Sequence, residues 1–217
     1  MRVRPEGVGR VKTKKPRSMW PKEHGAYAQL GIPLATALAC GRPTIAALLF
    51  VVAACAAFLA HEPGAILLGA RGTRARRENR RRAVHALGWS VAIAALAGLF
   101  ALALAPPPAR ILAALAFVLA ALAGLVLYER KERTRGGEII AAVALAGAAA
   151  PVGSACGLPT WIVLTCWAVW TAQFVVSTFA VHALIDEHAS LKSIRATGIA
   201  LAITMTMSGA SLAIGAR

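Results

Sequence analysis

The sequence predicts an all-α fold, a polytopic membrane bundle of seven transmembrane helices with the N-terminus in the cytoplasm and the C-terminus outside. Two observations lead to this prediction. The first is a series of seven long apolar stretches in a chain that is 58% hydrophobic and only 15% charged. The second is that nearly all of the charges fall in alternate gaps between those stretches. A helix needs roughly 17–25 apolar residues to cross a bilayer, and its backbone amides must bond within the segment.

The predicted domain organisation is simple. Residues 1–24 form a basic cytoplasmic arm, and residues 25–217 form one seven-helix membrane domain. The first 19 residues are basic and lack the apolar core of a secretory signal peptide. Glycine and proline inside the apolar stretches are normal for membrane helices. The seven predicted spans, in chain order, are Gly25–Gly41, Pro43–Ala60, Ala83–Ala105, Pro108–Tyr128, Gly137–Cys156, Pro159–Ile185 and Ala196–Ala216.

The orientation follows from the basic residues, which a membrane protein retains mainly in its cytoplasmic loops. Of the 24 lysines and arginines, 21 lie in the N-terminal arm or in the gaps that follow spans two, four and six. The other three are Arg42, Arg110 and Arg217, one in each connection or end on the other side. Membrane topology therefore accounts for the net charge of +15, and we expect no nucleic-acid partner.

The acidic residues and histidines show a stronger asymmetry. All nine acidic residues and all five histidines lie in the predicted cytoplasmic segments or in the adjoining helix turns. The positive-inside rule does not require this, because aspartate and glutamate contribute little to orientation. A site that uses charge, metal or proton transfer should therefore open to the cytoplasm. The four cysteines are far apart in the sequence and lie in or at the ends of apolar stretches. We therefore expect them to be small packing residues and expect no disulfide framework.

Two candidate clusters lie around the first two spans. At the start of the first span, Glu23 is favourably placed near a helix N-terminus, and His24 is a ligand, a proton carrier or simply a helix-start residue. At the end of the second span, His61 and Glu62 precede an arginine-rich segment. Its arginines suit phosphate binding, and contact with lipid headgroups is the alternative interpretation.

The other two clusters follow spans four and six. Residues 128–138 alternate in charge like a solvated loop, with Glu138 at the start of the fifth span. On the sixth span, Thr171, Thr178, His182 and Asp186 fall within an arc of roughly 80° on one helix face, which predicts contact with a watery cavity or with other helices. Asp186 and Glu187 would hold a divalent cation, although their spacing matches no specific metal signature.

Several of these segments resemble one family of bacterial membrane proteins. The segment Trp20-Pro-Lys-Glu-His-Gly-Ala-Tyr-Ala-Gln29, the His61-Glu62-Pro63 end of the second span and the arginine-rich loop ending Glu78-Asn-Arg-Arg-Arg82 look like the YwiC-like family. The resemblance spans most of the chain. It implies a multi-pass protein of the bacterial inner membrane, and it does not imply any particular enzymatic activity.

A more distant similarity is to the UbiA-type prenyltransferases, which are helical membrane enzymes with acidic motifs in the cytoplasmic loops after helices 2 and 6. Polar loops follow helices 2 and 6 here as well, and the segment from Tyr128 through Glu138 resembles that family around helix 5. The family's first aspartate-rich motif is absent, with Glu62 and Glu78-Asn79 as its nearest counterparts, and the second is reduced to Asp186-Glu187. Mg²⁺ uses carboxylates together with substrate phosphates, so this resemblance implies a reduced magnesium site at most.

Two hypotheses of different class follow. In the first, the protein is a UbiA-like enzyme that acts on an isoprenoid or lipid diphosphate in a cytoplasm-facing cavity. The catalytic residues would be Asp186, His182 and His61, the metal-side residues Glu62, Asp186 and Glu187, and the substrate-binding residues Arg77, Arg80, Arg81, His24 and Glu23. In the second, it is a non-catalytic transporter or a lipid-binding accessory protein in contact with membrane lipid. We find no internal repeat in the sequence, which weighs against a transporter, and the sequence does not fix the oligomeric state.

Overall fold

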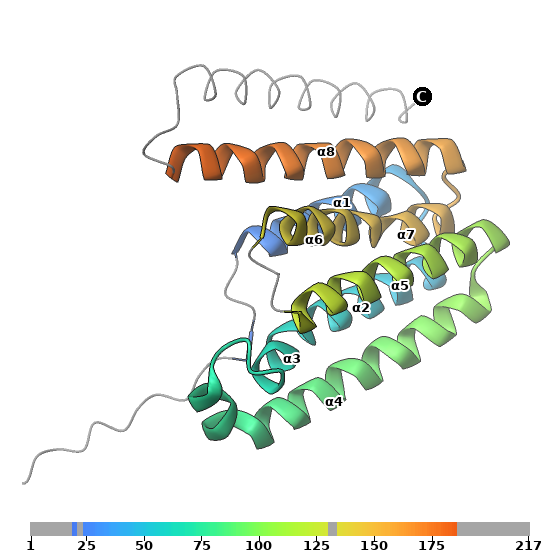
Figure 1. The fold of residues 1–217 in the computed structure, drawn as a ribbon. Coiled ribbons are helices and arrows are strands. Elements are labelled where there is room, and N and C mark those ends of the chain that lie inside the picture. The colour runs from blue at the N-terminus through green and yellow to red at the C-terminus, as the bar shows by residue number, and fades with distance from the viewer. Residues whose placement is uncertain (1–18, 21–23, 130–133, 186–217) are drawn as a thin grey trace, which may run out of the picture.

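A computed structural model describes residues 19–20, 24–129 and 134–185, and in these residues the chain is helical with no strand (Figure 1). Apart from α5 and α6, consecutive described helices are joined by connections of one to five residues. The eight helices of the described residues are α1 (His24–Cys40), α2 (Ile45–Leu59), α3 (His61–Leu67), α4 (Thr73–Leu104), α5 (Pro107–Tyr128), α6 (Arg135–Gly147), α7 (Ala149–Ala155) and α8 (Thr160–Ile185).

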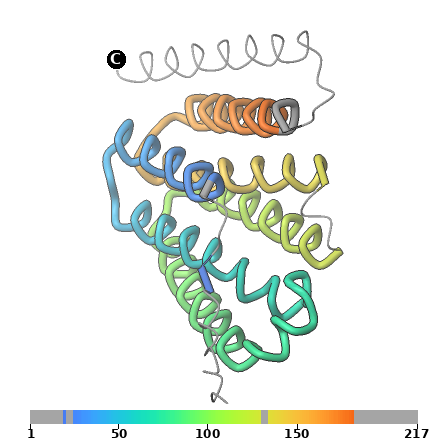
Figure 2. Tube along the Cα trace, turned by 90° about the vertical axis from the view of Figure 1, so that its left-hand side faces the viewer, coloured from blue at the N-terminus to red at the C-terminus, as the bar shows by residue number. Residues whose placement is uncertain are grey.

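The long helices run roughly parallel to one another, so that the connections from one span to the next lie at the two ends of the bundle (Figures 1 and 2). Among the described helices, α4 lies on one side and α8 on the opposite side. Between them, α2 packs against α4, α5 packs against α6 and α7, and α1 packs against α6 and α7. This is the side-by-side arrangement expected of a membrane bundle with short connections.

Six of the seven predicted spans coincide with described helices, and the seventh, Ala196–Ala216, lies outside the described residues. Within the described residues, five helical segments have the length and composition to cross a membrane. These are Ile45–Leu67, Thr73–Leu104, Pro107–Tyr128, Arg135–Ala155 and Thr160–Val181. The apolar helix α1 has 17 residues, at the lower limit for a span.

The prediction of a loop over residues 62–82 was wrong, because most of this segment is helical. Helix α3 continues the second span as far as Leu67, and α4 begins at Thr73, ten residues before the predicted start of the third span. The reason is local: the arginine-rich run has no glycine or proline between Thr73 and Leu87, and arginine and alanine are good helix formers. Arg74 and Glu78 add an ion pair at i and i+4, with 2.7 Å between Nε and Oε1.

Two prolines explain why two of the spans are each divided into two labelled helices. Proline has no N–H to donate to the carbonyl four residues earlier, and its ring clashes with that carbonyl. Pro63 accordingly follows a single-residue interruption of the helical hydrogen bonding at Ala60, and Pro151 follows one at Ala148. Both residues keep right-handed helical dihedrals, so each span stays one continuous helical segment. Pro33 lies inside α1, which continues past it without a break.

The core is built largely from small side chains, which let the helices approach closely. The main buried cluster contains seven alanines together with a few larger residues such as Leu30, Phe50 and Val152. Large apolar side chains on α4 and α5 point outward instead, including Leu99, Ile111 and Phe117, which are 65%, 71% and 75% exposed. Such an apolar outer surface is what a hydrocarbon environment favours, since lipid tails solvate these side chains well.

Candidate functional site at the polar end of the bundle

The charged residues of the described chain gather at one end of the bundle, which we call the polar end. It comprises α3, the α3–α4 connection, the first three turns of α4, the C-terminus of α5 and the N-terminus of α6, which meet at the same end of the bundle (Figure 1). The opposite end carries Arg42 and Arg110, and the Arg110 guanidinium donates to the Ala105 carbonyl at 2.9 Å. The segregation of charge predicted from the sequence is therefore present in the fold.

A buried ion pair holds the centre of the polar end together. The Glu62 side chain on α3 is 1% exposed, and it accepts from Arg71 in the α3–α4 connection. The Arg71 Nε and Nη2 atoms lie 3.1 and 3.0 Å from the same carboxylate oxygen, Oε2. Desolvated charges are costly unless they are paired, so the pairing explains how a glutamate is accommodated in an apolar helix.

The backbone of the connection is shaped to bring Arg71 back to Glu62. Gly69 and Gly72 flank the arginine with φ angles of 76° and 94°, in a region that only glycine adopts readily. Gly69 closes α3, because its N–H donates to the Ile66 carbonyl and the Ala70 N–H donates to the Ala65 carbonyl. The chain then reverses at Gly72 and starts α4 antiparallel to α3.

The predicted phosphate-binding arginines lie on the outer surface of α4. Arg77, Arg80 and Arg81 are all exposed, whereas Asn79 and Ala83 on the opposite face of the same turns are buried. The Asn79 side chain donates to the Ala75 carbonyl at 3.0 Å. The arginines therefore form an open cationic surface beside the apolar part of α4 and do not line an enclosed pocket.

The structure brings some of the predicted site residues together and keeps others apart. His61 and Glu62 lie on α3, which packs against the arginine-bearing start of α4. The helix that carries His182, α8, packs against α6, α7 and α1 on the other side of the bundle (Figures 1 and 2). His24 opens α1 at the polar end, and the side chains of His24 and His182 lie outside the description, as do residues Glu23, Asp186 and Glu187.

Sequence reasoning did not single out Arg71 as the partner of Glu62, or Asn79 as a buried polar residue of α4. The signal for the first was available, since a carboxylate in an apolar helix needs a nearby cation, and Arg71 stands between two glycines. Within the part of the chain that the structure describes, no group of three histidine, cysteine, aspartate or glutamate side chains is gathered closely enough to hold a metal ion.

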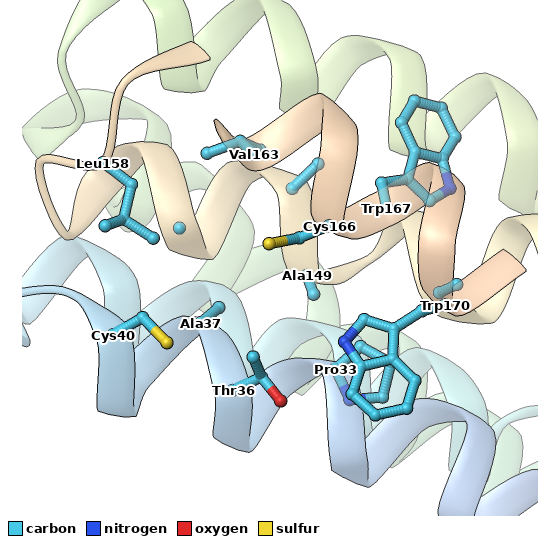
Figure 3. Close-up of a pocket in the computed structure, with 13 residues that line it drawn as sticks. Pro33, Thr36, Ala37, Cys40, Ala149, Leu158, Val163, Cys166, Trp167 and Trp170 are labelled. Carbon is cyan, nitrogen blue, oxygen red and sulfur yellow. The ribbon is translucent and has the colours of Figure 1, made fainter. Parts of the chain in front are cut away.

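An apolar pocket lies elsewhere, between α1, the α6–α7 junction and α8 (Figure 3). Its free volume of about 30 Å³ is enough for one or two waters and too small for a substrate. Trp167 closes part of it by stacking its ring over Gly147 and donating from Nε1 to the Val143 carbonyl at 3.1 Å. Of the predicted site residues whose side chains the structure describes, none lines this pocket.

Fold and site together define a helical membrane protein with a cationic surface at one end. A match to the family described as YwiC-like protein covers residues 20–153, from Trp20 into α7. This is more than half of the chain, so the protein belongs to the YwiC-like family. No curated protein matched the chain, and no solved structure did.

Proposed function

We propose that this protein is a multi-pass protein of the bacterial cell membrane that binds phosphate-bearing lipids at its cytoplasmic end. The proposal includes the full predicted topology of seven spans, with the N-terminus inside and the C-terminus outside. The basic residues of the polar end support the orientation, because such residues are retained in the cytoplasm. The reduced set of carboxylates favours a binding role over metal-dependent chemistry.

One observation carries the proposal, namely the exposed arginines at the start of α4. The guanidinium group presents planar paired donors that match phosphate oxygens. The same helix continues directly into an exposed apolar surface that includes Val84 and Trp89. A ligand that fits both parts has an anionic phosphate or diphosphate head and a hydrocarbon chain, as an isoprenoid or acyl lipid phosphate does.

The test is the binding of a fluorescent phosphatidic acid and of a prenyl diphosphate to detergent-purified protein. We expect the triple variant Arg77→Gln, Arg80→Gln, Arg81→Gln to lose most of the binding, because each charge-assisted hydrogen bond contributes about 1.5–3 kcal/mol. Lipid binding by the triple variant at the wild-type level would overturn the proposal.

A charge-matched control separates specific phosphate contacts from general attraction. The variant in which the same three arginines become lysine keeps the positive charge but loses the forked donor geometry. Weak binding by the lysine variant would indicate phosphate recognition by the guanidinium groups. Full binding by the lysine variant would indicate a surface that attracts lipid headgroups through charge alone. Lipid binding by the wild type and by the lysine variant should fall as the salt concentration rises.

The second candidate function is the UbiA-like enzyme acting on an isoprenoid or lipid diphosphate. It is favoured by the position of His61, Glu62 and the α4 arginines at one end of the bundle. It requires Asp186 and Glu187 to supply the remaining metal-side carboxylates, and Mg²⁺ would then neutralise the diphosphate. Turnover that is abolished by Asp186→Asn in a folded protein would support the enzyme, and full turnover in that variant would exclude it.

A further inference from the structure

We propose that the small pocket between α1 and α8 is a binding site for a single Cu(I) ion, held by the thiol groups of Cys40 and Cys166. The two cysteines belong to different helices, since Cys40 is the last residue of α1 and Cys166 lies in the second turn of α8. Both line the same pocket. The pocket lies toward the end of the bundle opposite the polar end (Figure 1), so this site is independent of the arginine surface and of the proposed lipid binding.

The packing of α1 against α8 brings the two thiols to one small space. The helices run in opposite directions, so the last turn of α1 meets the first turns of α8 (Figure 1). Figure 3 shows Cys40 and Cys166 on facing sides of the pocket, with the Cys166 sulfur directed into the space between the helices. The two thiol groups are close enough to interact electrostatically.

The two sulfur atoms are available to a ligand. Two other polar groups of the pocket wall are already bonded to the backbone: the Thr36 hydroxyl donates to the carbonyl four residues earlier at 2.9 Å, and the Trp167 Nε1 donates to the Val143 carbonyl at 3.1 Å. Within the part of the chain that the structure describes, the thiols of Cys40 and Cys166 make no hydrogen bond.

The size of the pocket and its two sulfur ligands restrict the choice of ligand. The free volume of about 30 Å³ is close to that of one water in the liquid, so the pocket admits a single ion and no organic molecule. Zn²⁺ needs four ligands, and Ca²⁺ and Mg²⁺ need several oxygen ligands. Neither requirement is met, because the described residues gather no group of three histidine, cysteine, aspartate or glutamate side chains.

Cu(I) fits a site of this kind because it is a soft ion that thiolates select, and two of them are enough to hold it. Binding needs no oxidant or reductant. Each thiol releases its proton to water, and the ion stays Cu(I) while it forms one bond to each sulfur. The product carries one negative charge, and Arg42, two residues after Cys40, supplies a positive charge at the same end of the bundle.

The test is the transfer of Cu(I) from its coloured bathocuproine disulfonate complex to reduced, detergent-purified full-length protein in the absence of oxygen. We expect the wild type to take up one Cu(I) per chain. Cys40→Ala and Cys166→Ala should each weaken this binding by at least about 100-fold, since even the outer-shell partners of a metal contribute about 10–100-fold. The matched control is Cys55→Ala, which removes an exposed thiol of α2 outside the pocket and should bind like the wild type.

A second measurement decides the matter without a variant. Copper X-ray absorption of the loaded wild type should show two sulfur ligands and no nitrogen or oxygen ligand, and any other ligand set overturns the proposal. Wild-type protein that takes no Cu(I) from the chelator also overturns it. Equal loss of binding in Cys40→Ala and Cys55→Ala would show adventitious binding by any thiol and would contradict the site. Lipid binding by the α4 arginines is measured separately, so the failure of one proposal leaves the other intact.

Discussion

The variant Arg71→Gln is expected to destabilise the protein by about 3–5 kcal/mol, because it leaves the Glu62 carboxylate buried without its guanidinium partner. The measurement is chemical unfolding in detergent micelles, followed by helical circular dichroism. The matched control is Arg74→Gln, which breaks the Arg74–Glu78 pair nearby on α4. Those side chains are 75% and 51% exposed, so we expect no measurable change in stability.

A double variant separates the cost of removing one partner of the Glu62–Arg71 pair from the value of the pair itself. Replacing both Glu62 and Arg71 with leucine and methionine removes both charges and keeps similar volumes. We expect this protein to be more stable than the Arg71→Gln single variant, because the buried Glu62 charge is removed together with its Arg71 partner. A double variant less stable than the single variant would contradict this explanation. The difference between the double variant and the wild type measures what the ion pair itself contributes to stability.

The variant Gly41→Ala should destabilise the opposite end of the bundle by about 1–3 kcal/mol through overpacking. A Cβ atom on Gly41 would overlap the Cys156 Cβ and lie 3.0 Å from the Cys156 carbonyl oxygen. Two hydrogen bonds fix this approach, from the Arg42 N–H to the Cys156 carbonyl at 2.9 Å and from the Thr44 hydroxyl to the Ala155 carbonyl at 3.0 Å. The α1–α2 turn therefore cannot move away from Cys156 without breaking these two hydrogen bonds.

Gly31→Ala is the control for the Gly41 experiment. Gly31 lies inside α1, where a new Cβ would meet nothing within 4 Å, and alanine is the better helix former. Its stability should be unchanged or slightly raised in the same unfolding assay. Equal loss of stability in the two variants would mean that the contact with Cys156 is not the cause.

Much of the fold was predictable from the sequence, because hydrocarbon imposes helices and short connections leave few alternatives. Six predicted spans coincide with described helices, and the charged residues gather at one end as expected. The position where α4 begins was missed because hydropathy marks the apolar part of a helix and is blind to an arginine-rich extension. The interruptions at Ala60 and Ala148 depend on single prolines, which hydropathy also ignores.

The candidate site was less predictable, because it depends on which helices pack together. The sequence placed His61, Glu62 and the arginines on one side of the membrane, and the packing of α3 on α4 brings them near one another. The sequence did not show that Glu62 forms an ion pair with Arg71, because hydropathy does not reveal that Gly69 and Gly72 turn the chain back toward Glu62. The roles assigned to Glu23, Asp186 and Glu187 stay predictions, as these residues lie outside the description.

The most direct test of the central claim asks which side of the membrane the polar end faces. Single cysteines are introduced at Arg76, in the first turn of α4, and at Arg42, at the opposite end, in a protein whose four native cysteines are replaced by alanine; both positions are exposed. Intact cells are then treated with a maleimide that does not cross the membrane. We predict labelling at position 42 in intact cells and labelling at position 76 only after the cells are opened. The reverse pattern would place the arginine surface outside the cell and contradict the account.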